Sequence, residues 1–150
     1  MKKYDNELNT FFIRTFNKIL NSEERTLQRS KIPDLSVKEL HIIEAVGLLE
    51  PEKKSTMSNL AVNVGISVGA LTTAVNAIVR KGYLTRAGDE NDRRKVYIFL
   101  TESGKKAFLL HEKYHKNMIN GITSVLTEPE LDTLIKSLAT LSEFFENTKL

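Results

Sequence analysis

The spacing of the apolar residues changes partway along the chain, and this change limits the possible folds more than any other feature. From residue 60 to residue 78 they recur at steps of three or four, which is typical of two short helices that each bury one face. After Gly82 they alternate with polar residues, as in the strands of a hairpin. The residues concerned are Leu60, Val64, Leu71, Val75 and Ile78 in the helices and Val96, Ile98 and Leu100 in the second strand. The chain is therefore expected to combine a tight helix pair with a β-ribbon.

Two helices are expected before the tight pair. The first covers residues 5–29 and carries a broad apolar face at helical spacing. The second begins after Ser36, which forms a capping box with Glu39. Gly47 and Pro51 are expected to bound the C-terminal end of that helix.

Two more helices are expected after the hairpin. Thr101 caps the first, which runs to about residue 125, and Thr127 with Glu130 forms a capping box for the last, which runs to about residue 147. These helices and the one at residues 5–29 carry wider apolar faces than the middle of the chain can cover. A second copy of the chain is the simplest partner for such faces.

The composition limits the chemistry that the side chains can perform and the cell compartment in which the protein is expected. The chain has no cysteine, so disulfides, thiolate metal sites and thiol switches are excluded. No apolar run reaches the ~20 residues of a membrane span, and the N-terminus does not resemble a signal peptide, so a cytoplasmic protein without a membrane partner is expected. Residues 51–101 hold eight Lys/Arg against four Asp/Glu, which concentrates positive charge in the middle third.

The tight helix pair has the spacing of a helix-turn-helix. Ala61 is small where the helices cross, Gly65 permits the left-handed turn, and Ile66 and Leu71 are expected to fill the space between the helices. Ser67 is expected to cap the second helix, whose N-terminal part would enter a DNA major groove.

The side chains opposite the buried face of that second helix suit base edges. Threonine and asparagine can hydrogen-bond to bases, a valine methyl can touch the thymine methyl, and glycine allows close backbone approach. Arg80 and Lys81 are expected near phosphates. The DNA-binding residues expected on this helix are Ser67, Val68, Gly69, Thr72, Thr73, Asn76 and Arg80. Glycine-linked helix pairs also occur in proteins that do not bind DNA, so the pair alone does not decide the function.

The hairpin tip carries three successive cations, Arg93, Arg94 and Lys95. An arginine on a protruding hairpin suits the narrow, electronegative minor groove, and Asp92 is placed to orient it. Charges at hairpin tips are equally often only solvated, but beside a helix-turn-helix they are expected to form a DNA-contacting wing.

Together these features resemble the MarR family of bacterial winged-helix regulators over essentially all 150 residues. The residues that carry the resemblance are Leu60-Ala61, Gly65-Ile66-Ser67, Lys81-Gly82-Tyr83-Leu84 and the run from Asp92 to Thr101. The resemblance implies a homodimeric DNA-binding regulator of a pseudo-palindromic operator, not an enzyme. It implies a mainly α fold with a small β-hairpin wing, a winged-helix lobe at about 36–101, and dimerisation helices at about 5–30 and 102–147. Arg94 would be the minor-groove arginine and Asp92 its orienting partner.

Within the family the chain is most similar to FabT-type repressors of fatty-acid synthesis genes. The segments concerned are 36–43, 69–73 and 111–116. This similarity implies a long-chain acyl-acyl carrier protein as effector, and a regulator of another regulon that responds to a small aromatic or lipophilic ligand is the alternative. The candidate pocket residues are Phe12, Phe16, Ile43, His111, Tyr114 and His115. The phenylalanines also fit simple core or dimer packing, which is the favoured interpretation of them.

A zinc-binding protein or metallohydrolase is a remote alternative. His111, Glu112 and His115 match the HExxH pattern, which places two imidazoles on one helical face. A third ligand would come from Glu128, Glu130, Glu143 or Glu146. Because so short a pattern arises easily by chance, neither a metal nor a cofactor is expected. His41 is expected to be a partly buried helix residue. The scattered cations on and after the first helix, which stand beside Glu23 and Glu24, could meet an acidic carrier protein but more commonly mark a solvated face. These cations are Arg14, Lys18, Arg25, Arg29 and Lys31.

Overall fold

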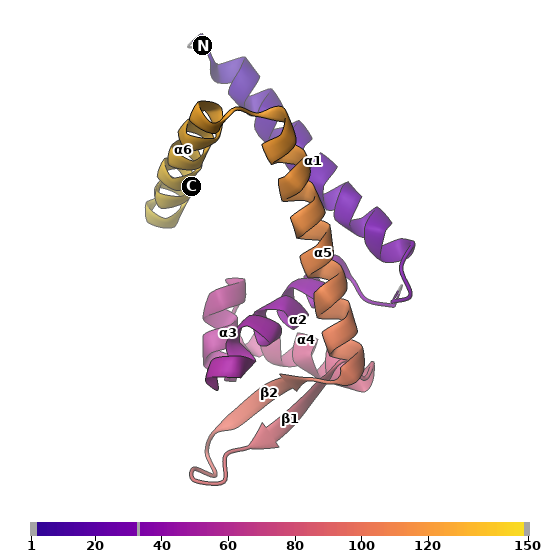
Figure 1. Cartoon of the computed structure of the whole chain (residues 1–150). Helices are drawn as coiled ribbons and strands as arrows, with labels where there is room; N and C mark the ends of the chain where they lie inside the picture. Colours follow the sequence, from indigo (N-terminus) through magenta and orange to yellow (C-terminus); the bar gives the residue numbers. More distant parts are fainter. Residues whose placement is uncertain (1–2, 33, 149–150) are drawn as a thin grey trace. The chain divides into compact units, whose positions relative to one another are not determined.

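Helices dominate the computed structural model, which describes residues 3–32 and 34–148. Its elements are α1 (Asp5–Gln28), α2 (Val37–Leu49), the 3-10 turn η1 (Glu50–Glu52), α3 (Met57–Val64), α4 (Val68–Arg80), β1 (Leu84–Gly88), β2 (Val96–Leu100), α5 (Glu102–Val125) and α6 (Glu128–Asn147) (Figure 1). The two strands pair antiparallel, with Leu84 opposite Leu100. The expected mainly α fold with a β-hairpin is confirmed. The chain divides into two compact units, Met1–Glu112 and Lys113–Leu150, with the boundary inside α5.

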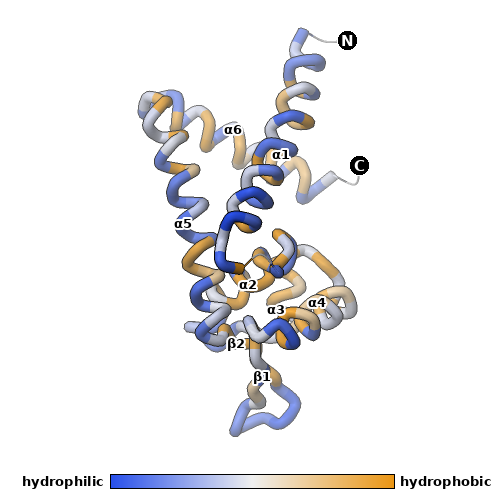
Figure 2. The backbone as a smooth tube through the Cα atoms, turned by 90° about the vertical axis from the view of Figure 1, so that its right-hand side faces the viewer, coloured by the Kyte–Doolittle hydropathy of each residue, from blue (hydrophilic) through white to orange (hydrophobic). Residues whose placement is uncertain are grey.

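The hydrophobic core of the first unit lies where α2, α3 and α4 pack together and against the hairpin (Figures 1 and 2). Leu71, Val75 and Ile78 of α4 are all 0% exposed, which confirms the predicted inward face of this helix. From the hairpin, Leu84 and Ile98 join the same core. The buried face of α4 therefore fixes which of its side chains remain outside.

The helix α2 begins after Ser36 as predicted and ends at Leu49, between Gly47 and Pro51, the two residues expected to bound its end. The Ser36 hydroxyl accepts from the Glu39 N–H, and the Glu39 carboxylate accepts from the Ser36 N–H, so the capping box is confirmed. Gly47, expected to bound this helix, lies inside it. The reason is packing, because a Cβ at Gly47 would stand 2.5 Å from Cδ2 of Phe108. The glycine makes room for an aromatic ring instead of ending the helix.

The turn between α3 and α4 has the predicted geometry with one difference. Gly65 adopts φ +76°, the left-handed conformation that glycine takes without steric cost. Ser67 caps α4 by accepting from the Ala70 N–H at 3.1 Å. Ile66 is 38% exposed, so the expectation that it fills the space between the helices is wrong. Leu60 occupies the core there instead, at 0% exposure.

Several helices carry apolar faces that are exposed in the single chain. The exposed apolar residues are Leu8, Phe11, Ile13, Phe16, Ile19 and Leu20 on α1, Ile119, Ile122 and Val125 on α5, and Ile135, Leu138, Phe144 and Phe145 on α6. No residue of α6 is buried among those described. At the start of that helix, the Glu130 carboxylate accepts from both the N–H and the hydroxyl of Thr127, each at 2.8 Å.

Among the described helices, none is by itself long and apolar enough to cross a membrane. Taken together, α3 and α4 are long and apolar enough to cross a membrane by length and composition only. The pair is bent by 102° at the break between the two helices.

Candidate nucleic-acid interface

The exposed face of α4 carries the residues expected to read DNA. Val68 is 48% exposed, and Ser67, Gly69, Thr73 and Arg80 are also exposed. Thr72 and Asn76 are partly buried on the same helix. The structure thus places the predicted set of seven outside the core, while the opposite face of α4 is fully buried.

The two threonines of α4 bond to their own helix. The Thr72 hydroxyl donates to the Val68 carbonyl at 2.8 Å, and the Thr73 hydroxyl donates to the Gly69 carbonyl at 3.3 Å. Each hydroxyl oxygen keeps lone pairs that can accept from a base amino group. The methyl groups also remain able to contact a thymine methyl.

Arg86 is a residue of this surface that sequence reasoning missed. It lies on β1 opposite Ile98, and its Nη2 donates to Oδ1 of Asn76 on α4. The bond ties the first strand of the hairpin to the recognition face of α4. A basic residue on an outward strand position next to a helix-turn-helix was the only signal in the sequence, because the contact itself depends on how strand and helix pack.

The wing, defined here as residues 84–100, ends in a polar tip (Figure 2). The Arg94 N–H donates to Oδ1 of Asp92 at 3.0 Å, and Nε of Arg94 lies 3.6 Å from the same oxygen. The Arg94 side chain is 94% exposed, so this pair adds little stability. Asp92 contacts the start of the arginine residue and leaves most of the guanidinium open to solvent, and its orienting role stays a prediction.

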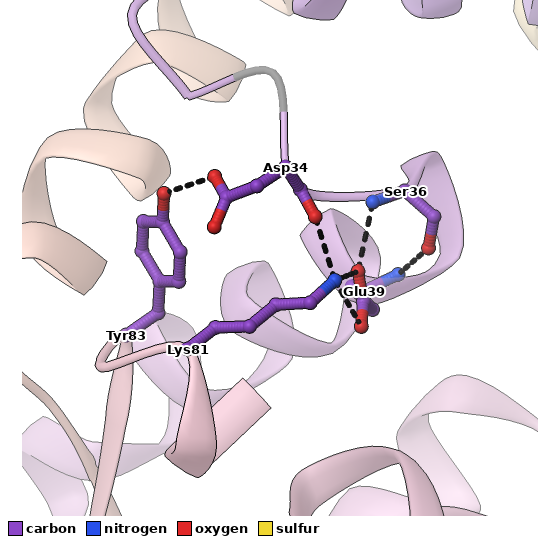
Figure 3. Close-up of polar contacts among 5 residues, drawn as sticks. All are labelled: Asp34, Ser36, Glu39, Lys81 and Tyr83. Atoms are coloured by element: carbon purple, nitrogen blue, oxygen red, sulfur yellow. Dashed lines mark hydrogen bonds and ion pairs between the residues drawn. The ribbon is translucent and has the colours of Figure 1, made fainter. Parts of the chain in front are cut away.

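Lys81, which was expected near phosphates, contacts acidic residues of the chain itself, and its role at phosphate stays a prediction. Its Nζ donates to the Asp34 carbonyl at 2.6 Å and to Oε2 of Glu39 at 2.8 Å (Figure 3). The Tyr83 hydroxyl donates to Oδ1 of Asp34 at 2.6 Å, and burial together with this acidic neighbour raises the pKa of Tyr83 to about 12. These contacts anchor the C-terminal end of α4 to the N-terminal end of α2.

Replacing Glu39 with glutamine is expected to lower the free energy of unfolding by about 1 kcal/mol at pH 7. Burial raises the pKa of Glu39, but the hydrogen bonds from Lys81 and Ser36 outweigh it, and the pKa lies below its usual 4.5. A lowered pKa stabilises the fold above the unfolded-state pKa, and this contribution is lost as the pH falls through the folded-state value.

Urea unfolding of wild type and Glu39→Gln at pH 7 and at about pH 3.5 measures this dependence. The difference between the two proteins should shrink at the lower pH. Glu102→Gln is the control, because Glu102 pairs with Lys105 with 86% of its side chain exposed. A difference that is unchanged at acid pH would contradict the role of the Glu39 charge.

A cavity in the first unit has a volume of about 570 Å³. It is lined by the cations Arg29, Lys31 and Lys106 and by the apolar Ile32 and Leu110, among others. None of the six expected pocket residues lines it.

Those six residues lie in different settings. Ile43 is 0% exposed in the core and His111 is 2% exposed, while the Phe12 ring stacks on Phe16 along α1 with centroids 6.1 Å apart. Tyr114 and His115 belong to the second unit. The assignment of a pocket to these residues remains a prediction.

A capped recognition helix with a fully buried inner face, joined to a cationic hairpin, defines a winged helix-turn-helix protein that binds DNA. Comparison with known proteins agrees with this class. The family model described as transcriptional regulator SarA/Rot matches residues 28–110. The chain is 33% identical to FabT of Streptococcus pneumoniae in a crystal structure with DNA, at a TM-score of 0.87, covering 96% of this chain and 99% of that one.

Two curated relatives extend the comparison. An uncharacterised HTH-type transcriptional regulator of Bacillus subtilis, YwhA, is 33% identical over 88 residues, which are 59% of this chain and 63% of YwhA, so the chain spans under two thirds of that relative. The transcriptional regulator AdcR of Streptococcus pyogenes is 27% identical over 148 residues, 97% of this chain and 96% of AdcR. The chain belongs to the MarR family of winged-helix transcriptional regulators. It is a DNA-binding regulator and not an enzyme.

Proposed function

We propose that this chain is a homodimeric repressor of fatty-acid synthesis genes whose DNA binding responds to a long-chain acyl-acyl carrier protein. The observation that carries the proposal is the likeness to FabT, which extends over 96% of the chain at a TM-score of 0.87. It covers the helices outside the winged-helix lobe as well as the lobe itself.

The exposed apolar faces of α1, α5 and α6 support the homodimer. Phe11 and Phe16 on α1 are 53% and 58% exposed, and Ile135 on α6 is 63% exposed. Removing apolar surface of this extent from water favours association with a partner. A second copy of the chain brings an identical set of faces, and a twofold arrangement then presents two recognition helices to one pseudo-palindromic operator.

The proposed DNA contacts fall into two groups. The α4 residues Ser67, Val68, Gly69, Thr72, Thr73, Asn76 and Arg80 are assigned to the major groove, and Arg93, Arg94 and Lys95 of the wing to the minor groove, with Asp92 as the orienting residue. The support is exposure on one face of α4 and, at the tip, the bond between Asp92 and Arg94.

The cavity of about 570 Å³ supports a lipophilic effector with an acidic end. Its volume lies within the range of small-molecule sites. Ile32 and Leu110 offer apolar surface, while Arg29, Lys31 and Lys106 offer positive charge. A lipid chain attached to an acidic carrier meets both requirements, and so does the alternative effector, a small aromatic or lipophilic anion.

Affinity for a fatty-acid gene promoter, measured with and without long-chain acyl-acyl carrier protein at one salt concentration, tests the proposal. We expect the acylated carrier to change affinity by about 5–150-fold, the usual range of allosteric coupling. The carrier without an acyl chain is the ligand control. Lys106→Glu should reduce the response, and Lys116→Glu, exposed further along α5, is the matched variant. An affinity independent of the acyl chain would reject this effector and leave the family-level function standing.

A further inference from the structure

A side-chain hydrogen bond joins the hairpin to the recognition face of α4. Nη2 of Arg86 on β1 donates to Oδ1 of Asn76 on α4, ten positions earlier in the chain. Arg86 is exposed and Asn76 is partly buried. The pair therefore lies outside the core, on the surface that carries the residues assigned to DNA.

The hydrophobic core holds the backbones of both residues in place. Asn76 directly follows Val75 on α4, and Arg86 stands opposite Ile98 in the hairpin. Val75 and Ile98 are both 0% exposed and belong to the same core. Groups carried by packed elements keep a fixed geometry better than groups on free loops. The relative positions of the two side chains are therefore set by the fold.

The bond also determines how the amide group of Asn76 is turned. A guanidinium carries five N–H donors and no acceptor. Only the amide oxygen of Asn76 can face it, so Nδ2 with its two hydrogens is directed to the other side. Asn76 then offers a donor, rather than a donor and an acceptor together, to a base edge.

This orientation changes the base that the asparagine suits. An unconstrained asparagine pairs with adenine by donating to N7 and accepting from the N6 amino group. Here Oδ1 of Asn76 already accepts from a cation, and the hydrogens of an adenine amino group would meet the positive charge of Arg86. Guanine presents acceptors at both O6 and N7 in the major groove. Nδ2 of Asn76 and the further N–H groups of Arg86 are donors that match both acceptors.

We propose that Arg86 is a positioning residue for Asn76, and that the two side chains together select guanine over adenine at one position of the operator half-site. The proposal rests on the assignment of α4 to the major groove and is independent of the regulon and the effector. It gives the hairpin two roles in DNA binding. The tip is assigned to the minor groove, while Arg86 of β1 sets the base that α4 reads in the major groove.

Selection of bound duplexes from a random library, with full-length wild type and Arg86→Ala, tests the proposal. G·C and A·T pairs are then compared by competition at each position of the selected site. We expect wild type to prefer guanine at one position by about 5–150-fold, the usual discrimination of a paired base contact. Arg86→Ala should reverse this preference to adenine, because the Asn76 amide can then both donate to N7 and accept from N6.

Lys116→Ala is the matched control, because it removes the same charge from an exposed position of α5. It should keep the guanine preference of the wild type. A loss of stability in Arg86→Ala would weaken binding to all duplexes alike, so a reversed preference separates positioning from a merely structural role. The same base preference in wild type and Arg86→Ala would overturn the proposal and leave DNA binding and the proposed effector standing.

A second measurement uses modified bases and the wild-type protein alone. A deazaguanine without N7, placed at the preferred guanine, should weaken binding about tenfold because one acceptor is lost. Hypoxanthine keeps O6 and N7 and lacks only the minor-groove amino group, so it should bind as guanine does. Equal affinity for guanine and the deazaguanine, or a loss of affinity with hypoxanthine alone, would also overturn the proposal.

Discussion

Arg94→Ala is expected to weaken operator binding on the order of tenfold or more and to flatten its dependence on salt. Arg94 stands at the wing tip with 94% of its side chain exposed and its backbone fixed to Asp92. Each cation lost from the DNA backbone region lowers the slope of log K against log salt by about 0.9. The proposed homodimer would lose two such cations, so the slope should fall by about 2.

Affinities of wild type and Arg94→Ala for one operator duplex at four or more salt concentrations check this expectation. Lys116→Ala removes the same charge from an exposed position of α5 and serves as the control for net charge. If Arg94→Ala and Lys116→Ala gave the same slope and affinity, the wing would have no part in binding.

Gly104→Ala is expected to destabilise the fold by about 3 kcal/mol, near the upper end of overpacking costs. A Cβ at this position would stand 2.1 Å from the Tyr83 carbonyl oxygen. That oxygen cannot move away cheaply, because it accepts from the Thr101 N–H at 3.1 Å. The gain in helix propensity from alanine, about 1 kcal/mol, is smaller than the cost of the clash.

Gly121→Ala, on the same helix, is the matched control for this substitution. A Cβ there meets nothing within 4 Å among the described residues, so alanine should raise stability by up to about 1 kcal/mol. Urea unfolding of both variants at one protein concentration separates the clash from helix propensity. Equal stability changes of the same sign would show that α5 does not pack against the Tyr83 carbonyl as described.

The sequence predicted those features that depend on local patterns. The buried face of α4, the glycine turn at Gly65 and the capping box at Ser36 all follow from spacing within a few residues, and the structure confirms each. The pairing of Asp92 with Arg94 is also local, since Arg94 follows Asp92 by two positions. Local patterns sufficed to predict the winged helix-turn-helix.

Features that depend on long-range packing could not be predicted in this way. The contact of Lys81 with Glu39 joins residues 42 positions apart in the chain. The contact of Glu23 with His111 joins residues 88 positions apart. Gly47 resembled a helix end because the ring that needs its space belongs to Phe108. In each case the deciding neighbour lies on another element.

The most direct test of a homodimer that binds two operator half-sites is how its affinity depends on the spacing between those half-sites. An operator selected by the protein from random duplexes is compared, at one salt concentration, with the same duplex carrying about 5 extra base pairs between its half-sites, half a helical turn. The affinity is expected to fall toward that of random DNA, because the second recognition helix then faces the wrong side of the duplex. Equal affinity for the two duplexes would contradict it.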